Sequence, residues 1–231
     1  HITSAGSNVP GWDPDGIPVC TAQGDQLNAK VAADGSGGVY VAWEDARRDL
    51  ATFPREGDIY AQHIMPNGSI APGWIENGIG VCALPGYRGT ISMLPDDTSG
   101  VFILWLDTRN GLGDIYAQRL QVDGSIAPGW VTDGVPVAVA PGYQRTAPLP
   151  STIAPDGDGG FLVAWDDSRG ATWDIYAQHM TALGTVAKGW PANGLPVCTA
   201  VDDQQYPQIV SDGAGGAIIG WIDYRNYDAT A

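Results

Sequence analysis

Short runs of hydrophobic residues, separated by turns rich in Gly, Asp and Pro, recur along the whole chain. Asn67-Gly68 is a strong hairpin-turn signal after one of these runs. No stretch carries the 3.6-residue hydrophobic period of an amphipathic helix, so the pattern predicts short β-strands and an all-β protein. In the first copy of the pattern, the runs lie at 27–33, 39–44, 59–65 and 79–83.

One sequence unit of about 58 residues occurs four times and covers nearly the whole chain. Each unit has a Gly-rich turn and the pattern Trp-x-Asp-x-Arg, and the first three units continue with the sequence Asp-Ile-Tyr-Ala-Gln and a Gly-Trp pair. The turn is degenerate in the second copy, at 96–100. The Trp-x-Asp-x-Arg patterns begin at Trp43, Trp105, Trp165 and Trp221, and Asp-Ile-Tyr-Ala-Gln occupies 58–62, 114–118 and 174–178.

The second strand of each unit is the most hydrophobic, and at 101–106 it is apolar on both faces. Such a strand belongs to a sheet that lies between two others, and four-stranded sheets arranged radially form a β-propeller. We therefore expect residues 1–231 to form a single domain, a four-bladed β-propeller. His1 aligns with His63, and 228–231 align with the start of Asp-Ile-Tyr-Ala-Gln, so the N-terminal segment is expected to close the last blade. Two alternatives stay open: a segment of a larger propeller in a longer chain, and a linear solenoid.

Charge and composition narrow the classes of partner. The chain has 26 acidic and 11 basic residues, a formal net charge of −15, which disfavours nucleic acid and anionic membrane surfaces. Its hydrophobic content of 44% and its nine Trp argue against disorder. No apolar run approaches the roughly 18 residues needed to span a bilayer, so we expect no membrane insertion.

The polar residues that recur in every unit are expected to hold the blades together rather than to catalyse a reaction. We expect the Arg of Trp-x-Asp-x-Arg to pair with a nearby carboxylate, with Asp58, Asp114 and Asp174 as candidates. No residue is predicted to be catalytic. The three Cys and three His occupy equivalent positions on separate blades, so we expect free buried thiols and no shared metal site. These residues are Cys20, Cys82, Cys198, His1, His63 and His179.

Two acidic turns are candidate metal sites. Carboxylates at alternate positions suit the oxygen ligation that Ca²⁺ prefers, although Asp and Gly are also the ordinary residues of tight turns. No other cofactor is expected. The carboxylates are Asp13 and Asp15 in one turn, and Asp156 and Asp158 in the other.

Residues that differ between the units are the better candidates for ligand binding, because the repeat does not explain them. The loops at 48–57 and 143–152 are enlarged. Aromatic side chains on loops can stack on sugar rings or anchor a protein partner. The ligand-binding candidates are the aromatic residues Tyr87, Tyr143 and Trp173, and the acids Asp25, Asp202 and Asp203, which precede first strands.

The unit Asp-Gly-x-Gly-Gly-x-x-x-Ala-Trp-x-Asp-x-Arg, followed by Asp-Ile-Tyr-Ala-Gln, resembles a propeller-like repeat of secreted and cell-surface bacterial proteins. The match runs through 34–74, 101–130, 156–190 and 212–225. What the resemblance implies is an extracellular or cell-surface module, with no catalytic residues to carry over.

These observations favour a non-catalytic extracellular module that binds a glycan or a protein through loops on one propeller face. A first alternative is a structural subunit of a surface layer or filament, which would self-associate through its split last blade. A second is a polysaccharide-acting enzyme with acids near the propeller axis, since glycoside hydrolysis needs two carboxylates about 5 to 10 Å apart. Asp25, Asp202 and Asp203 are the acids to test first.

Overall fold

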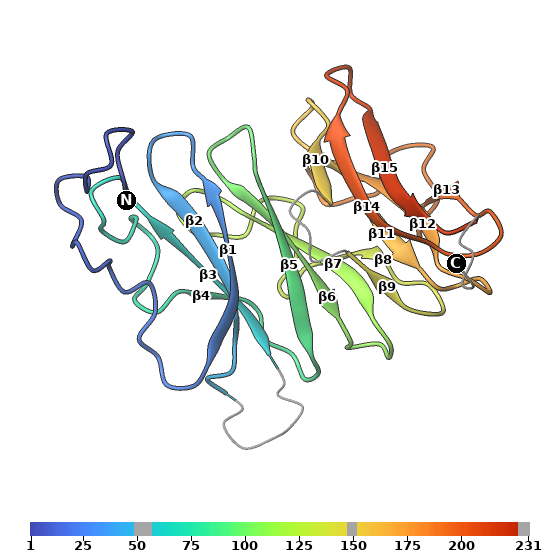
Figure 1. The fold of residues 1–231 in the computed structure, drawn as a ribbon. Coiled ribbons are helices and arrows are strands. Elements are labelled where there is room, and N and C mark those ends of the chain that lie inside the picture. Colours follow the sequence, from blue (N-terminus) through green and yellow to red (C-terminus); the bar gives the residue numbers. More distant parts are fainter. Residues whose placement is uncertain (49–56, 147–151, 226–231) are drawn as a thin grey trace, which may run out of the picture.

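The computed structural model describes residues 1–48, 57–146 and 152–225, and within them the chain is all β (Figure 1). Most of the two enlarged loops, and the segment 228–231, lie outside the described residues. The described part holds no helix of the length and apolar character that crossing a membrane requires. The strands are β1 (Gln26–Ala33), β2 (Val39–Asp45), β3 (Asp58–Ile64), β4 (Ile79–Cys82), β5 (Arg88–Pro95), β6 (Val101–Asp107), β7 (Asp114–Leu120), β8 (Val135–Ala138), β9 (Gln144–Arg145), β10 (Ile153–Pro155), β11 (Phe161–Asp167), β12 (Asp174–Met180), β13 (Leu195–Cys198), β14 (Gln204–Ser211) and β15 (Ala217–Asp223).

Each sequence unit folds into its own antiparallel sheet, and the sheets follow one another across the molecule (Figure 1). Unit one pairs its strands in the order β1-β2-β3-β4, and unit two in the order β5-β6-β7-β8. Unit three has the order β10-β11-β12-β13, with β9 also paired to β11, and unit four contains β14 and β15. The four strands predicted for the first unit are confirmed, with ends that differ by at most one residue.

The hydrophobic core lies between neighbouring sheets rather than inside any one of them. All seven residues of β6 are buried. Ile103 and Trp105 pack toward unit one, whereas Phe102 and Leu104 pack toward unit three. Side chains alternate between the two faces of a strand, so this central strand fills two junctions at once. The prediction that it is covered on both faces is confirmed.

The turn between the first two strands of each unit is organised by its first Asp. In unit one, Asp34 Oδ1 accepts hydrogen bonds from the backbone N–H groups of Ser36 and Gly38, both at 2.8 Å. A Cβ on Gly38 would lie 2.5 Å from the Ile64 carbonyl oxygen, so the close approach of β3 requires glycine there. Asp96 caps the degenerate second turn in the same way, through the N–H groups of Thr98 and Gly100.

The Trp-x-Asp-x-Arg pattern is a structural lock at the end of the second strand. In unit two, Trp105 Nε1 donates to Asp107 Oδ2 at 2.8 Å, and Arg109 Nη2 lies 2.6 Å from the same oxygen. The Arg109 guanidinium also lies 3.9 Å from the centre of the Tyr116 ring. Units one and three repeat these contacts.

The predicted partner of this Arg is corrected by the structure. Arg109 pairs with the Asp of its own pattern rather than with Asp114, because its backbone N–H also bonds to Asp107 Oδ1 and holds the two together. In unit one the candidate Asp58 is taken by other cations, since it accepts from Arg48 and lies 3.7 Å from Arg88 Nη1.

The structure also corrects the predicted closure of the last blade. Residues 1–25 lie beside unit one, where Trp12 Nε1 donates to the Pro66 carbonyl oxygen at 2.7 Å. Unit four stands at the opposite end of the molecule, and its described part consists of β14 and β15 (Figure 1). The N-terminal segment therefore does not complete this sheet.

The repeated Cys and His residues make contacts within their own units and with the next unit, as where Arg109 Nη2 of unit two donates to Cys82 Sγ of unit one at 3.1 Å. All three Cys are free, as predicted, but only Cys82 is fully buried, while Cys20 and Cys198 are half-buried. The His179 ring contacts Asp156 of its own turn at 2.8 Å. The described residues contain no cluster of three or more side chains that could hold a metal ion.

Candidate functional site

Four of the six predicted ligand-binding residues occupy one repeat position, at the same end of each sheet. In every unit, the backbone oxygen at this position accepts from the residue that follows the Asp of Trp-x-Asp-x-Arg, at 2.9 to 3.1 Å. The position therefore holds an acid in units one and four and a tyrosine in units two and three. In unit order, its occupants are Asp25, Tyr87, Tyr143 and Asp203.

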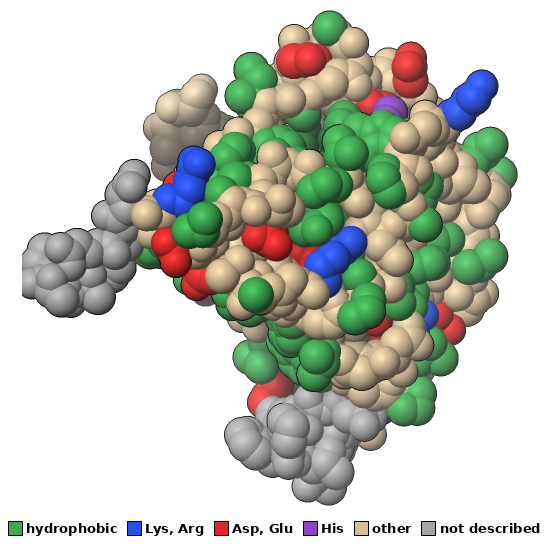
Figure 2. Space-filling model, turned by 90° about the vertical axis from the view of Figure 1, so that its right-hand side faces the viewer, with side chains coloured by type: hydrophobic (Ala, Val, Ile, Leu, Met, Phe, Trp, Pro, Cys, Tyr) green, Lys and Arg blue, Asp and Glu red, His purple; other side chains and the backbone are tan. Residues whose placement is uncertain are grey.

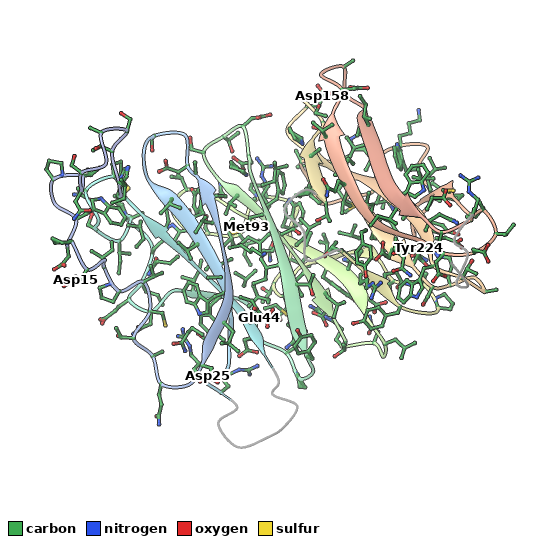
Figure 3. All side chains as sticks on the ribbon, viewed as in Figure 1. Asp15, Asp25, Glu44, Met93, Asp158 and Tyr224 are labelled. Carbon is green, nitrogen blue, oxygen red and sulfur yellow. The ribbon has the colours of Figure 1, made fainter. Side chains whose placement is uncertain are left out.

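The structure brings three of the candidates together where unit three meets unit four. Trp173 lies in the loop before β12, and its backbone N–H donates to Asp203 Oδ1 at 3.0 Å. The Tyr143 ring meets the Trp173 ring edge-on, with 6.2 Å between centroids. The guanidinium of Arg145 lies 4.2 Å from the Trp173 ring centre, so one face of the indole is covered. Asp25 lies on unit one, far from this group (Figure 3).

A hollow of about 450 Å³ opens beside this group, lined by Thr172, Asp202, Asp203 and Tyr224. A second hollow, of about 430 Å³, lies at the matching place in unit two, next to unit three. There Leu112 and Gly142 stand where the first hollow has Thr172 and Asp202. The two hollows share their position in the repeat, but the one beside unit four carries the two carboxylates of 202 and 203.

Asp202 departs from the repeat in a way that has a conformational cost. The other three units place glycine at this position, with φ of +97° at Gly24, +109° at Gly86 and +91° at Gly142. Asp202 keeps the left-handed backbone, with φ of +63°. A residue with a Cβ in this region costs on the order of 1 kcal/mol relative to glycine. Backbone strain of this kind clusters at functional sites, and Asp is among the residues that adopt it most readily, as Asp133 also does here.

The electrostatics of the site come from carboxylates at close quarters. Burial raises the pKa of Asp174, the first residue of β12, and the charges of Asp167 and Asp203 raise it further. Asp203 accepts a second hydrogen bond, from Gln205 Nε2 at 3.0 Å. An acid that holds its proton more strongly than usual, Asp174, thus lies within electrostatic reach of a carboxylate fixed by two donors, while Asp203 and not Asp174 lines the hollow.

Sequence reasoning missed two acids near this junction. Asp174 was set aside because it belongs to the repeated Asp-Ile-Tyr-Ala-Gln. For Asp166 the sequence holds a usable signal, because the position between Trp and Asp of the pattern varies as Glu, Leu, Asp and Ile in the four units. Burial raises the pKa of Asp166, while hydrogen bonds from the Tyr206 N–H and Arg145 act against the rise.

The two predicted calcium turns lie on different parts of the molecule, as the positions of Asp15 and Asp158 in Figure 3 show. In each turn the first Asp accepts the backbone N–H of the second, Asp13 from Asp15 and Asp156 from Asp158, both at 2.8 Å. The four carboxylates are therefore not brought together into one site. Calcium binding by either turn stays a prediction.

Comparison with known proteins gives a likeness in structure but not in sequence. No family model matches the chain, so the resemblance to bacterial surface repeats gains no support there, and no curated protein matches it. Among solved structures, it resembles an endo-arabinase from Bacteroides thetaiotaomicron, with 16% identity and a TM-score of 0.44 over 89% of this chain and 72% of that one. It also resembles a thermostable family-43 glycoside hydrolase, with 13% identity and a TM-score of 0.46 over 85% of this chain and 65% of that one. A glycosyl hydrolase from Bacteroides ovatus shows 9% identity and a TM-score of 0.45 over 86% of this chain and 60% of that one.

The expectation of a non-catalytic binding module is contradicted by this comparison, because these structures are named as glycoside hydrolases, and it is not carried forward. Their identities and TM-scores assign neither a reaction nor a substrate to this chain. The case for an activity therefore rests on the chain's own residues.

Proposed function

We propose that the chain acts on a polysaccharide, at the hollow beside units three and four. The observation that carries the proposal is Asp202, which keeps a left-handed backbone where the other three units have glycine. This substitution adds a second carboxylate next to Asp203 in a hollow that also contains the Tyr224 ring. Paired carboxylates beside aromatic rings are the chemistry that binds and cleaves sugars.

The reaction we propose is hydrolysis of a glycosidic bond. Asp174, whose pKa is raised, gives its proton to the leaving glycosidic oxygen as the bond to the anomeric carbon breaks. Water adds to that carbon, and its proton passes to a carboxylate of the Asp202–Asp203 pair. Thr172 and Tyr224 line the hollow and would contact the sugar hydroxyls and ring.

We also infer how the sheets are arranged and where the protein is located. Each sheet packs on the next through the same repeat positions, which supports four consecutive propeller blades. A location outside the cell or on its surface agrees with a polymeric substrate. The location remains part of the proposal.

The test is release of reducing ends from a panel of polysaccharides, measured with the wild-type chain and two variants. Asp203→Asn removes one carboxylate from the hollow and is expected to lower the rate by at least about a hundredfold. Asp25→Asn is the matched control, because Asp25 occupies the same repeat position on unit one and should leave the rate unchanged. A wild-type chain that releases no sugar from any member of the panel would refute the proposal, as would full activity in Asp203→Asn.

A further inference from the structure

Asn67 and Gly68, a strong turn signal in the sequence, form an exposed turn that the proposed function does not use. The turn follows β3 and is closed by two backbone hydrogen bonds, from the Met65 N–H to the Ser69 oxygen at 2.8 Å and from the Gly68 N–H to the Met65 oxygen at 2.9 Å. It lies at the unit-one end of the molecule (Figure 1), away from the unit-four side that Figure 2 shows. A change in this turn therefore leaves the hollow beside unit four untouched.

Asn is among the chemically labile residues, and an Asn-Gly pair is open to attack on its own side chain. The glycine nitrogen adds to Cγ of the Asn, ammonia leaves, and a five-membered succinimide ring forms. Water then opens the ring at one of its two carbonyls, which yields either Asp or isoaspartate, whose main chain runs through Cγ. Glycine favours this reaction because it has no Cβ to obstruct the attack. The chain contains four such pairs, at 67–68, 77–78, 110–111 and 193–194.

Among these four pairs, Asn67 combines an exposed side chain with an unrestrained leaving group. Its Oδ1 accepts two hydrogen bonds from Ser69, from the backbone N–H at 3.0 Å and from the hydroxyl at 2.7 Å. Its Nδ2, which departs as ammonia, donates to no other residue in the part of the chain that the structure describes. In the other exposed pair, by contrast, Asn110 Nδ2 donates to the Tyr116 hydroxyl at 2.7 Å. The two donors on Asn67 Oδ1 also stabilise the negative charge that develops there as the ring closes.

The pairs at 77–78 and 193–194 are held by the packing between units. Oδ1 of Asn77 and Oδ1 of Asn193 each accept a backbone N–H from the segment before their unit, at 2.6 and 3.0 Å. The Arg of the Trp-x-Asp-x-Arg pattern donates to the backbone oxygen of each Asn, at 2.8 and 2.7 Å. A Cβ on Gly78 would lie 2.5 Å from the Trp43 ring, and Gly194 packs on a Trp ring in the same way. Neither backbone has room to rotate into a succinimide.

Unit two shows the turn as it would be after Asn67 has become Asp. Asp123 and Gly124 hold the same repeat position. Asp123 Oδ1 accepts the N–H and the hydroxyl of Ser125 at the same two distances, 3.0 and 2.7 Å. The Asp product is therefore compatible with the turn. Isoaspartate is not, because it inserts one more carbon atom into a main chain that two hydrogen bonds hold closed.

The same turn seats the N-terminal segment on unit one. Trp12 Nε1 donates to the Pro66 carbonyl oxygen at 2.7 Å, and a Cβ on Gly68 would lie 3.7 Å from the Trp12 ring. The backbone oxygen of Asn67 faces Gly11, 3.3 Å from the place where a Cβ on that glycine would stand. A longer main chain at position 67 would displace all of these contacts.

We propose that Asn67 is a site of spontaneous deamidation in the folded chain, and that its isoaspartate product releases the N-terminal segment from unit one. An exposed turn opens locally at little cost in free energy, and opening frees the Gly68 nitrogen from the Met65 oxygen for the attack. The reaction consumes water and releases ammonia, so it requires no other reactant. Its products are a turn like that of unit two and a turn that no longer seats Trp12.

Peptide mapping by mass spectrometry, on the chain aged in mildly alkaline buffer, tests the first step. Asn67 is expected to deamidate at least about tenfold faster than the other three Asn-Gly pairs, because its turn opens most readily. In guanidinium chloride, where the chain is unfolded, the four pairs should react at similar rates. Asn67→Leu is the matched control, since unit three has Leu183 in the same turn and leucine forms no succinimide. A folded chain in which Asn67 reacts no faster than Asn77 or Asn193 would overturn the site.

Exchange of the Trp12 indole N–H with deuterium, followed by NMR, tests the release. Exchange is expected to become faster in the aged wild-type chain in proportion to its isoaspartate content. It should stay slow in aged Asn67→Leu and in fresh Asn67→Asp, which carries the compatible product. An aged chain with isoaspartate at position 67 and an unchanged Trp12 exchange rate would overturn the release. None of these results depends on whether the hollow beside unit four cleaves polysaccharide.

Discussion

His63 Nε2 lies 3.0 Å from Asp34 Oδ2, and both side chains are buried. The contact ties the third strand of unit one to the turn between its first two strands. In unit two the same positions hold Arg119 and Asp96, whose Nε and Oδ2 atoms are 2.8 Å apart. A basic side chain on the third strand thus holds the turn carboxylate even where the residue type changes.

Asp34 is expected to make stability dependent on pH in the acid range. Burial alone would raise its pKa, but the hydrogen bonds from His63, Ser36 and Gly38 together lower it to about 2. A pKa lowered in the folded state stabilises the fold above the unfolded value near 4, and this stabilisation is lost as the pH falls toward about 2. Asp34→Asn should therefore cost about 2 kcal/mol at neutral pH. Urea unfolding at pH 7, 4 and 3 should show the difference from wild type shrinking with the pH, and a constant difference would contradict the prediction.

The lock formed by Trp-x-Asp-x-Arg should matter most where it is buried. Asp107→Asn removes the charge that faces both Arg109 and the buried Arg88, whose Nε lies 3.3 Å from it. Leaving these cations without their carboxylate should lower the free energy of unfolding by about 3 kcal/mol. Asp223→Asn changes the same repeat position in unit four, where the pair is exposed to water, and should cost much less. Chemical denaturation of both variants measures the contrast, and equal losses would refute it.

Glycine 134 is required by packing as well as by its backbone. A Cβ there would lie 2.5 Å from Trp105 Cη2 and 2.6 Å from the Ala117 carbonyl oxygen, at a φ of +80°. Gly134→Ala should therefore cost at least about 3 kcal/mol. Gly213→Ala is matched in φ, at +74°, but its Cβ would meet nothing within 4 Å, so about 1 kcal/mol is expected. Thermal unfolding of the two variants separates packing from backbone strain, and similar losses would mean that the Trp105 contact does not matter.

Asp202→Gly should trade stability against activity. Restoring the glycine of the other three units relieves the left-handed backbone and should stabilise the fold by up to about 1 kcal/mol. The same change removes a carboxylate from the hollow, so release of sugar should fall. The reverse substitution, Gly142→Asp, places an acid in the second hollow and serves as the matched control, with stability lowered and activity unchanged. A destabilised or fully active Asp202→Gly would contradict the role given to this residue.

The sequence alone determined the repeat and the class of the fold. Short hydrophobic runs, broken by Gly and Asp turns, specify strands locally, and the apolar run at 101–106 specified a sheet covered on both faces. These features were accessible because they depend on neighbours close in the chain or on the repetition itself.

Only the tertiary structure decided how the units meet and where the carboxylates gather. Arg109 pairs with Asp107 rather than with Asp114 because of the geometry at the end of the strand. Burial and the charges of neighbouring carboxylates together raise the pKa of Asp174. The N-terminal segment packs on unit one, where the Trp12 indole donates a hydrogen bond to the Pro66 carbonyl. Alignment of the repeats could not distinguish this position from the equivalent position on the last sheet. A sequence repeat determines the strands within each unit. The packing between units and the local electric field arise from contacts between residues far apart in the chain.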